Sequence, residues 1–180
     1  MLIKGITDED FVNYKVPSMY IATATCSFKC DKEYGKPICQ NSELAKQPTM
    51  EIKYTDLVCR YLQNPITKAL VFGGLEPFDD AYDLYLLIGD LRVLFDCDDD
   101  VVIYTGYTKE ELEQMNFFDL IPNPDGFTFH PNRFHSVLDA FRFDNIIIKY
   151  GRYIPNQQPH YDPVLGVYLA SDNQYAERIS

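Results

Sequence analysis

Short apolar runs, rich in β-branched and aromatic residues, recur along the chain and constrain its fold more than any other feature. They are residues 19–25 (MYIATAT), 68–72 (KALVF), 101–105 (VVIYT) and 145–150 (NIIIKY), with residues 164–170 as a candidate fifth. In the segments between them, apolar residues are spaced as on one face of a helix, and helix-capping residues are present. Strands that alternate with helices predict right-handed βαβ units and a parallel sheet.

Helices are predicted between these runs from caps and apolar spacing. Thr55 is expected to cap a helix that ends at Gln63, Asp79 or Asp80 to open a second that extends toward Phe95, and Thr108 with Glu111 to form the capping box of a third. Residues 26–48 read as a long polar loop. Residues 116–135 read as irregular, and the sequence leaves open whether they are a lid, a partner contact or a plain insertion.

The length of the chain limits the architecture. A chain of 180 residues is too short for a complete eight-fold β/α barrel, which takes about 250 residues. We therefore expect an α/β fold, a partial (open) parallel β/α barrel, in a single domain over residues 1–180. The glycine-rich and cysteine-bearing loops each follow a predicted strand, which is the end of a parallel sheet where ligands bind.

The cysteines are unevenly distributed. Cys26, Cys30 and Cys39 fall in one stretch, while Cys59 and Cys97 are isolated and are predicted to be bystanders, Cys59 in the core. Thiolates are the natural ligands of iron–sulfur clusters, and a cluster held by three of them keeps one iron open. The cysteines alone leave two alternatives, a zinc site that lacks a fourth ligand and a set of unrelated free thiols.

Two further loops carry candidate ligand-binding residues. Gly73-Gly74-Leu75-Glu76-Pro77 follows the second run, and Tyr104-Thr105-Gly106-Tyr107 ends the third. Glycines let the backbone approach a ligand closely, and a carboxylate accepts hydrogen bonds from an amino group. Lys149 and Arg152 flank the end of the fourth run and are candidates to contact a carboxylate.

In this order the motifs resemble those of radical S-adenosylmethionine (SAM) proteins, and most closely the activating proteins of anaerobic (class III) ribonucleotide reductase. Cys26-x3-Cys30 matches the start of that family's cluster loop and Cys39-Gln40-Asn41 its end, while the two glycine loops and Ser171-Asp172-Asn173-Gln174 resemble its later motifs. Two departures stand out. Eight residues separate Cys30 from Cys39 where the family has two, and Leu75 is inserted before Glu76.

The resemblance implies a partial barrel of radical SAM type with a [4Fe-4S] cluster and SAM as cofactors. Reductive cleavage of SAM to a 5′-deoxyadenosyl radical would be the activity. It implies the catalytic and cluster-ligating residues Cys26, Cys30 and Cys39. Ile38 would touch adenine, Gly73, Gly74 and Glu76 would hold the methionyl end of SAM, and Thr105, Gly106 and Tyr107 would line the adenosine end.

The resemblance also implies partners. They are the large glycyl-radical subunit of an anaerobic ribonucleotide reductase and an electron donor such as flavodoxin or ferredoxin. A radical SAM enzyme acting on a small molecule, or a non-catalytic zinc- or cysteine-binding protein, are the alternatives. The net charge of −11 argues against nucleic acid and anionic membranes. With no long apolar run and no signal-peptide pattern, a cytoplasmic protein is expected.

Overall fold

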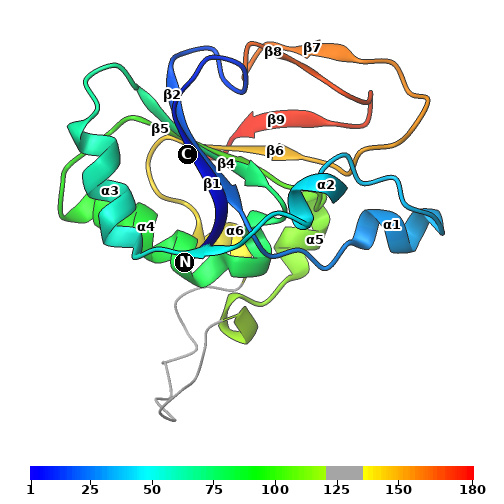
Figure 1. The fold of residues 1–180 in the computed structure, drawn as a ribbon, viewed down its shortest axis with the longest axis horizontal. Coiled ribbons are helices and arrows are strands. Elements are labelled where there is room, and N and C mark those ends of the chain that lie inside the picture. Colours follow the sequence, from blue (N-terminus) through cyan, green and yellow to red (C-terminus); the bar gives the residue numbers. More distant parts are fainter. Residues whose placement is uncertain (121–135) are drawn as a thin grey trace.

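The structure is a computed structural model, and it describes residues 1–120 and 136–180. Within these residues a seven-stranded sheet has the order β3-β1-β2-β4-β5-β6-β9 (Figure 1). Its strands are β1 (Leu2–Asp10), β2 (Ser18–Thr23), β3 (Met50–Glu51), β4 (Ala69–Gly74), β5 (Asp100–Tyr104), β6 (Ile146–Tyr150) and β9 (Tyr175–Arg178). Neighbours among β2, β4, β5 and β6 are parallel and follow chain order.

The sheet is mixed, so the prediction of a parallel sheet is correct only for its centre. β1 pairs antiparallel with β2 and β3, and β9 pairs antiparallel with β6. None of the three strands β1, β3 and β9 was predicted from the sequence. The fold class is therefore α/β with a large mixed sheet whose centre is parallel.

Helices cover one face of the sheet. The helices are α1 (Lys29–Tyr34), α2 (Ser42–Ala45), α3 (Tyr54–Gln63), α4 (Ala81–Val93), α5 (Lys109–Gln114) and α6 (Val137–Ala140), with 3-10 turns η1 (Pro77–Asp80) and η2 (Phe117–Leu120). Figure 1 shows α3, α4, α5 and α6 on one side of the sheet and the hairpin of β7 (His160–Asp162) and β8 (Val167–Leu169) on the other. α1 and α2 lie beyond the carboxyl ends of the parallel strands.

Both faces of the central strands are buried, which explains why these strands read as continuous apolar runs. Alternate residues point to opposite faces, so Phe72 and Ile103 join the core beneath the helices. Val71 and Ile147 belong to a smaller cluster on the other face, which Leu165 of the β7–β8 connection completes.

Several predicted boundaries were wrong. α3 begins at Tyr54 with Lys53 as its N-cap, so Thr55 lies inside the helix. Cys59 is exposed on α3 and is not a core residue. Phe95 lies beyond the end of α4 and is 45% exposed. The expected strand over residues 164–170 is the shorter β8, which pairs antiparallel with β7 in a separate sheet.

Other predictions are confirmed or fall outside the description. The Thr108–Glu111 capping box is present at the start of α5. The loop over residues 26–48 contains the short helices α1 and α2. Residues 121–135 lie outside the described part, so the prediction of irregular structure there stays a prediction. No helix in the described residues has the length and apolar character needed to cross a bilayer.

Candidate functional site

A cavity of about 330 Å³ opens at the carboxyl ends of the four parallel strands. Segments that follow β2, β4, β5 and β6 contribute to its wall. Of the residues singled out in the sequence, its lining includes Cys26, Cys30, Cys39, Gly74, Glu76, Thr105, Gly106, Tyr107, Lys149 and Arg152. Ile38 and Gly73 are not among the lining residues. The structure thus brings the three clustered cysteines and both glycine loops to one place.

The three cysteines lie close to one another along the cavity wall. The backbone N–H of Phe28 donates to Sγ of Cys26 at 3.2 Å, from a residue in the left-handed conformation (φ 51°). The negative charge that Cys39 carries when ionised acts on Cys30 and adds to the rise in the pKa of Cys30. Burial raises the pKa of Cys26 to about 11 and that of Cys30 to about 12, so both thiols are protonated without a metal. A bound metal would reverse this, because a coordinating thiol loses its proton.

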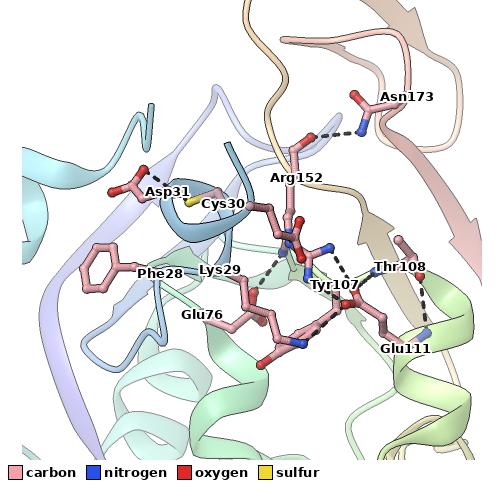
Figure 2. A network of polar contacts seen from close by, with 12 residues as sticks. Phe28, Lys29, Cys30, Asp31, Glu76, Tyr107, Thr108, Glu111, Arg152 and Asn173 are labelled. Atoms are coloured by element: carbon pink, nitrogen blue, oxygen red, sulfur yellow. Dashed lines mark hydrogen bonds and ion pairs between the residues drawn. The ribbon is translucent and has the colours of Figure 1, made fainter. Parts of the chain in front are cut away.

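The eight residues between Cys30 and Cys39 form a closed loop. Oδ1 of Asp31 accepts hydrogen bonds from the backbone N–H groups of Ile38 at 2.8 Å and Cys39 at 2.9 Å. Sγ of Cys30 lies 3.8 Å from the same oxygen, a contact drawn in Figure 2. Gly35 ends α1 in the left-handed conformation (φ 72°), where the chain turns back toward Cys39. The N–H contacts hold the pKa of Asp31 below its usual value, the one from Ile38 contributing most.

The two adjacent glycines have different structural roles. Gly74 has a φ of 82°, and a Cβ there would lie 3.0 Å from Ala22, so the position requires glycine. A Cβ at Gly73 would lie 2.8 Å from the hydroxyl of Tyr20, so this glycine makes room for the Tyr20 ring. The side-chain amide of Asn41 donates to the Gly74 carbonyl, which ties the cysteine loop to the glycine loop.

Glu76 is buried and joins the loops after β4 and β5. Its carboxylate accepts hydrogen bonds from the Thr105 hydroxyl at 2.7 Å, the Gly106 N–H at 2.8 Å and the Phe78 N–H at 3.2 Å. Burial raises the pKa of Glu76 to about 7, although these hydrogen bonds act in the opposite direction. Leu75 also lines the cavity. Glu76 thus holds the loops after β4 and β5 together, a structural role that the sequence did not predict.

Asp79 is a functional candidate that the sequence analysis treated only as a possible helix start. Its carboxylate accepts hydrogen bonds from the Tyr107 hydroxyl and from the backbone N–H of Ser27, both at 2.6 Å. Asp79 therefore links the cysteine loop to the end of β5. A short polar residue after Glu76-Pro77 is the only signal in the sequence, and it is also the ordinary signal of a helix N-terminus.

A charged network docks α1 against the ends of β5 and β6 (Figure 2). Arg152 contacts both carboxylate oxygens of Glu111, at 2.7 and 2.8 Å, and lies 3.3 Å from Glu33 on α1. Lys29 of α1 also contacts Glu111, at 3.3 Å, and sits 4.7 Å from the ring centre of Tyr107. Burial would raise the pKa of Glu111, but the hydrogen bonds and charge of Arg152, together with the Thr108 N–H and Lys29, outweigh it and hold the pKa at about 2.

Lys149, at the end of β6, is buried in the cavity wall. Its ammonium donates to the carbonyl of Gly151 at 2.8 Å. Burial lowers its pKa to about 8, although the negative charge of Glu76 acts in the opposite direction. Gln174, from the C-terminal motif, also lines the cavity and donates to the Gly151 carbonyl at 3.1 Å, and Asn173 donates to the Arg152 carbonyl at 2.9 Å.

The donor set distinguishes between two kinds of metal centre. A mononuclear zinc site needs ligands that converge on one point. Across residues 1–120 and 136–180, no group of three His, Cys, Asp or Glu side chains does so. A four-iron cluster binds each thiolate through a different iron, so its cysteine sulfurs surround the cluster and do not converge on one point. Cys26, Cys30 and Cys39 line one cavity, as the ligands of such a cluster would, and the N–H donor on Cys26 is of the kind that tunes cluster sulfurs.

Comparison with known families agrees with this assignment. A sequence model of the 4Fe-4S single cluster domain matches residues 17–127, more than half of the chain, including all three clustered cysteines and both glycine loops. No curated protein and no solved structure matches the chain. The matched family indicates a [4Fe-4S] cluster as cofactor. On this match, the chain belongs to the 4Fe-4S single cluster domain family.

Proposed function

We propose that the chain is a radical SAM enzyme that holds a [4Fe-4S] cluster on Cys26, Cys30 and Cys39 and reductively cleaves SAM. The observation that supports this most is the lining of one cavity by three thiols and by the loops after the next two parallel strands. Its volume of about 330 Å³ falls within the usual range for small-molecule sites. When bound, the cluster supplies the electron for the cleavage and an open iron for SAM.

The residues of the chain would then bind and orient SAM. In this proposal Gly74 and Glu76 would face the methionyl end, and Thr105, Gly106 and Tyr107 the adenosine end. The carboxylate of Glu76 has hydrogen-bonded neighbours already, so it would hold the ammonium through its remaining acceptor capacity. The predicted contact of Ile38 with adenine stays a prediction, and Gly73 would act by shaping the wall through Tyr20.

The substrate we propose is a glycine of the large subunit of an anaerobic ribonucleotide reductase, on which the enzyme would install a radical. The order of the motifs from Cys26 to Gln174 supports this. The proposal includes flavodoxin or ferredoxin as electron donor, a cytoplasmic location and an open barrel of radical SAM type.

A radical SAM enzyme acting on a small molecule is the second candidate, and one observation favours it. The β7–β8 hairpin covers the face of the sheet opposite the helices, where Leu165 is fully buried. The cavity wall is polar on that side, with Lys149, Asn13 and Gln174. A polar pocket wall beside the hairpin suits a small substrate with polar groups to bind.

Anaerobic reconstitution with iron and sulfide, followed by electron paramagnetic resonance of the reduced protein, tests the proposal. We expect a reduced four-iron signal that changes shape when SAM is added and is lost in Cys39→Ala. Cys59→Ala is the matched control, because Cys59 is exposed and lies outside the cavity lining. A protein that takes up no cluster, or whose cluster ignores SAM, would refute the radical SAM assignment.

The two substrates are separated by a second assay on the same material. With SAM and a chemical reductant, both candidates should yield 5′-deoxyadenosine. Addition of the large reductase subunit should then give an organic radical on that subunit if the first candidate is correct. Cleavage of SAM without radical transfer would favour the small-molecule candidate.

A further inference from the structure

The segment between Cys30 and Cys39 is the main departure of this chain from the radical SAM pattern, and in the structure it is an ordered element. α1 (Lys29–Tyr34) forms its first part, and Gly35 reverses the chain. The residues after Gly35 then bring Ile38 and Cys39 back beside Asp31. The insertion therefore lengthens the sequence between the two cysteines but returns the chain to its start, since the backbone N–H of Cys39 donates to Asp31, the residue that follows Cys30.

The contacts that close the loop converge on one atom. Oδ1 of Asp31 accepts from the N–H of Ile38 at 2.8 Å and from the N–H of Cys39 at 2.9 Å. Its third contact, with Sγ of Cys30 at 3.8 Å, exists only while that thiol carries a proton. The two backbone contacts do not depend on the protonation of any cysteine, so they would persist when all three thiols are ligands.

We infer that Asp31 is a positioning residue whose carboxylate closes the inserted loop and places Cys39 beside Cys30, so that the three cysteines form one ligand set despite the insertion. Asp31 acts through the backbone of Cys39 and is not itself a ligand. Outer-shell contacts of this kind orient the groups that bind a metal. The inference rests on the use of the three cysteines as ligands, which is part of the proposed function, and does not depend on SAM cleavage.

The first test uses the metal-free protein. Dibromobimane bridges two neighbouring thiols, and mass spectrometry of the digested protein identifies the bridged pair. We expect the Cys30–Cys39 bridge to form about fivefold more slowly in Asp31→Ala, on the scale of the net contribution of one ordinary hydrogen bond. Asp31→Asn keeps an oxygen acceptor and should stay within about twofold of the unaltered chain. Glu43→Ala is the control, because Glu43 is an exposed acidic residue on α2 whose carboxylate pairs with Lys46.

The second test measures cluster retention. After anaerobic reconstitution and gel filtration, Asp31→Ala should hold several-fold less iron and acid-labile sulfide per chain than the unaltered protein, and Asp31→Asn an intermediate amount. Circular dichroism and thermal unfolding check the fold of each variant. If Asp31→Ala does not fold, Asp31→Leu, which keeps the bulk of the side chain but not the acceptor, replaces it.

The outcomes separate this inference from the proposed function. Equal bridging rates and equal iron contents in Asp31→Ala and the unaltered chain would overturn the role of Asp31, whatever the protein does with SAM. Failure of the unaltered chain to take up iron would overturn the proposed function, and the bridging rates would still decide whether Asp31 brings the two cysteines together.

Discussion

Glu76 and Lys149 are oppositely charged side chains buried in the wall of one cavity. Burial disfavours the charged form of each, so the pKa of Glu76 rises to about 7 and that of Lys149 falls to about 8. The carboxylate is compensated by hydrogen bonds from Thr105 and Gly106. The ammonium of Lys149 donates to the Gly151 carbonyl, which also accepts a hydrogen bond from Gln174. Lys149 is thus poorly compensated for a buried cation, which fits a residue whose partner is a bound ligand.

Lys149→Met should stabilise the metal-free protein at pH 7. The pKa of Lys149 is near 10.5 in the unfolded chain and about 8 in the folded one. The folded state therefore binds fewer protons, and its stability rises with pH between these values. At pH 7 we expect the Met variant to gain roughly 2 kcal/mol, with the gain shrinking as the pH rises through 8 toward 10.5. Urea unfolding at several pH values measures this, and an unchanged free energy at pH 7 would contradict it.

At the scale of elements, the central strands were predictable and the flanking ones were not. β4, β5 and β6 are buried on both faces, so their apolar runs carried the signal. β1 reads Leu-Ile-Lys-Gly-Ile-Thr-Asp-Glu-Asp and β9 reads Tyr-Ala-Glu-Arg, without an apolar run. Such strands form because a neighbour supplies their hydrogen bonds, and this depends on the tertiary fold.

The candidate site, too, was predictable only in part. The cysteine and glycine loops were recognisable because each departs from ordinary composition at the end of a strand. The contacts that join the loops were not recognisable. Asp31, Asp79 and Asn41 are common loop residues. Each forms a hydrogen bond with a backbone group at least eight residues away in sequence. Pairings of this type follow only from the folded positions of the partners.

The docking of α1 is testable at this scale. Arg152→Met removes the contacts of Arg152 with Glu111 and Glu33, so α1 should detach from the sheet more often. Trypsin cleavage after the exposed residue Lys32 should accelerate about threefold, as expected for loss of a partly exposed ion-pair network. Lys109→Met, which breaks the ion pair with Glu177 instead, serves as the control and should leave this cleavage rate unchanged.

At the scale of the whole molecule, the sheet has helices on one face and the β7–β8 hairpin on the other (Figure 1). The cavity lies at the end of the parallel centre, at the edge shared by both layers. The helical layer supplies Asp79 and Glu111, which contact the lining residues Tyr107 and Arg152. The hairpin side supplies Tyr168 and Gln174 to the lining itself. The prediction that residues 1–180 form a single domain stays a prediction.

Leu165→Ala tests how firmly the hairpin is packed. Leu165 is fully buried against Val71 and Ile147 in the smaller cluster, so the substitution leaves a cavity and should cost about 3 kcal/mol of unfolding free energy. Tyr161→Ala, at a hairpin residue that is 54% exposed, should cost much less. Denaturant unfolding of both variants compares the two, and equal losses would show that the hairpin does not depend on this contact.

The antiparallel strands at the two sides of the sheet also bear on how copies of the protein meet one another. Had the sheet stopped at β6, its outermost strand would be the apolar Ile-Ile-Ile-Lys-Tyr segment with free backbone groups. Instead β9 occupies that side, with Glu177 and Arg178 in ion pairs with Lys109 and Asp100. The opposite side ends in β3, which is two residues long. Short or charged borders of this kind discourage aggregation by strand addition, so the apolar centre is kept from self-association.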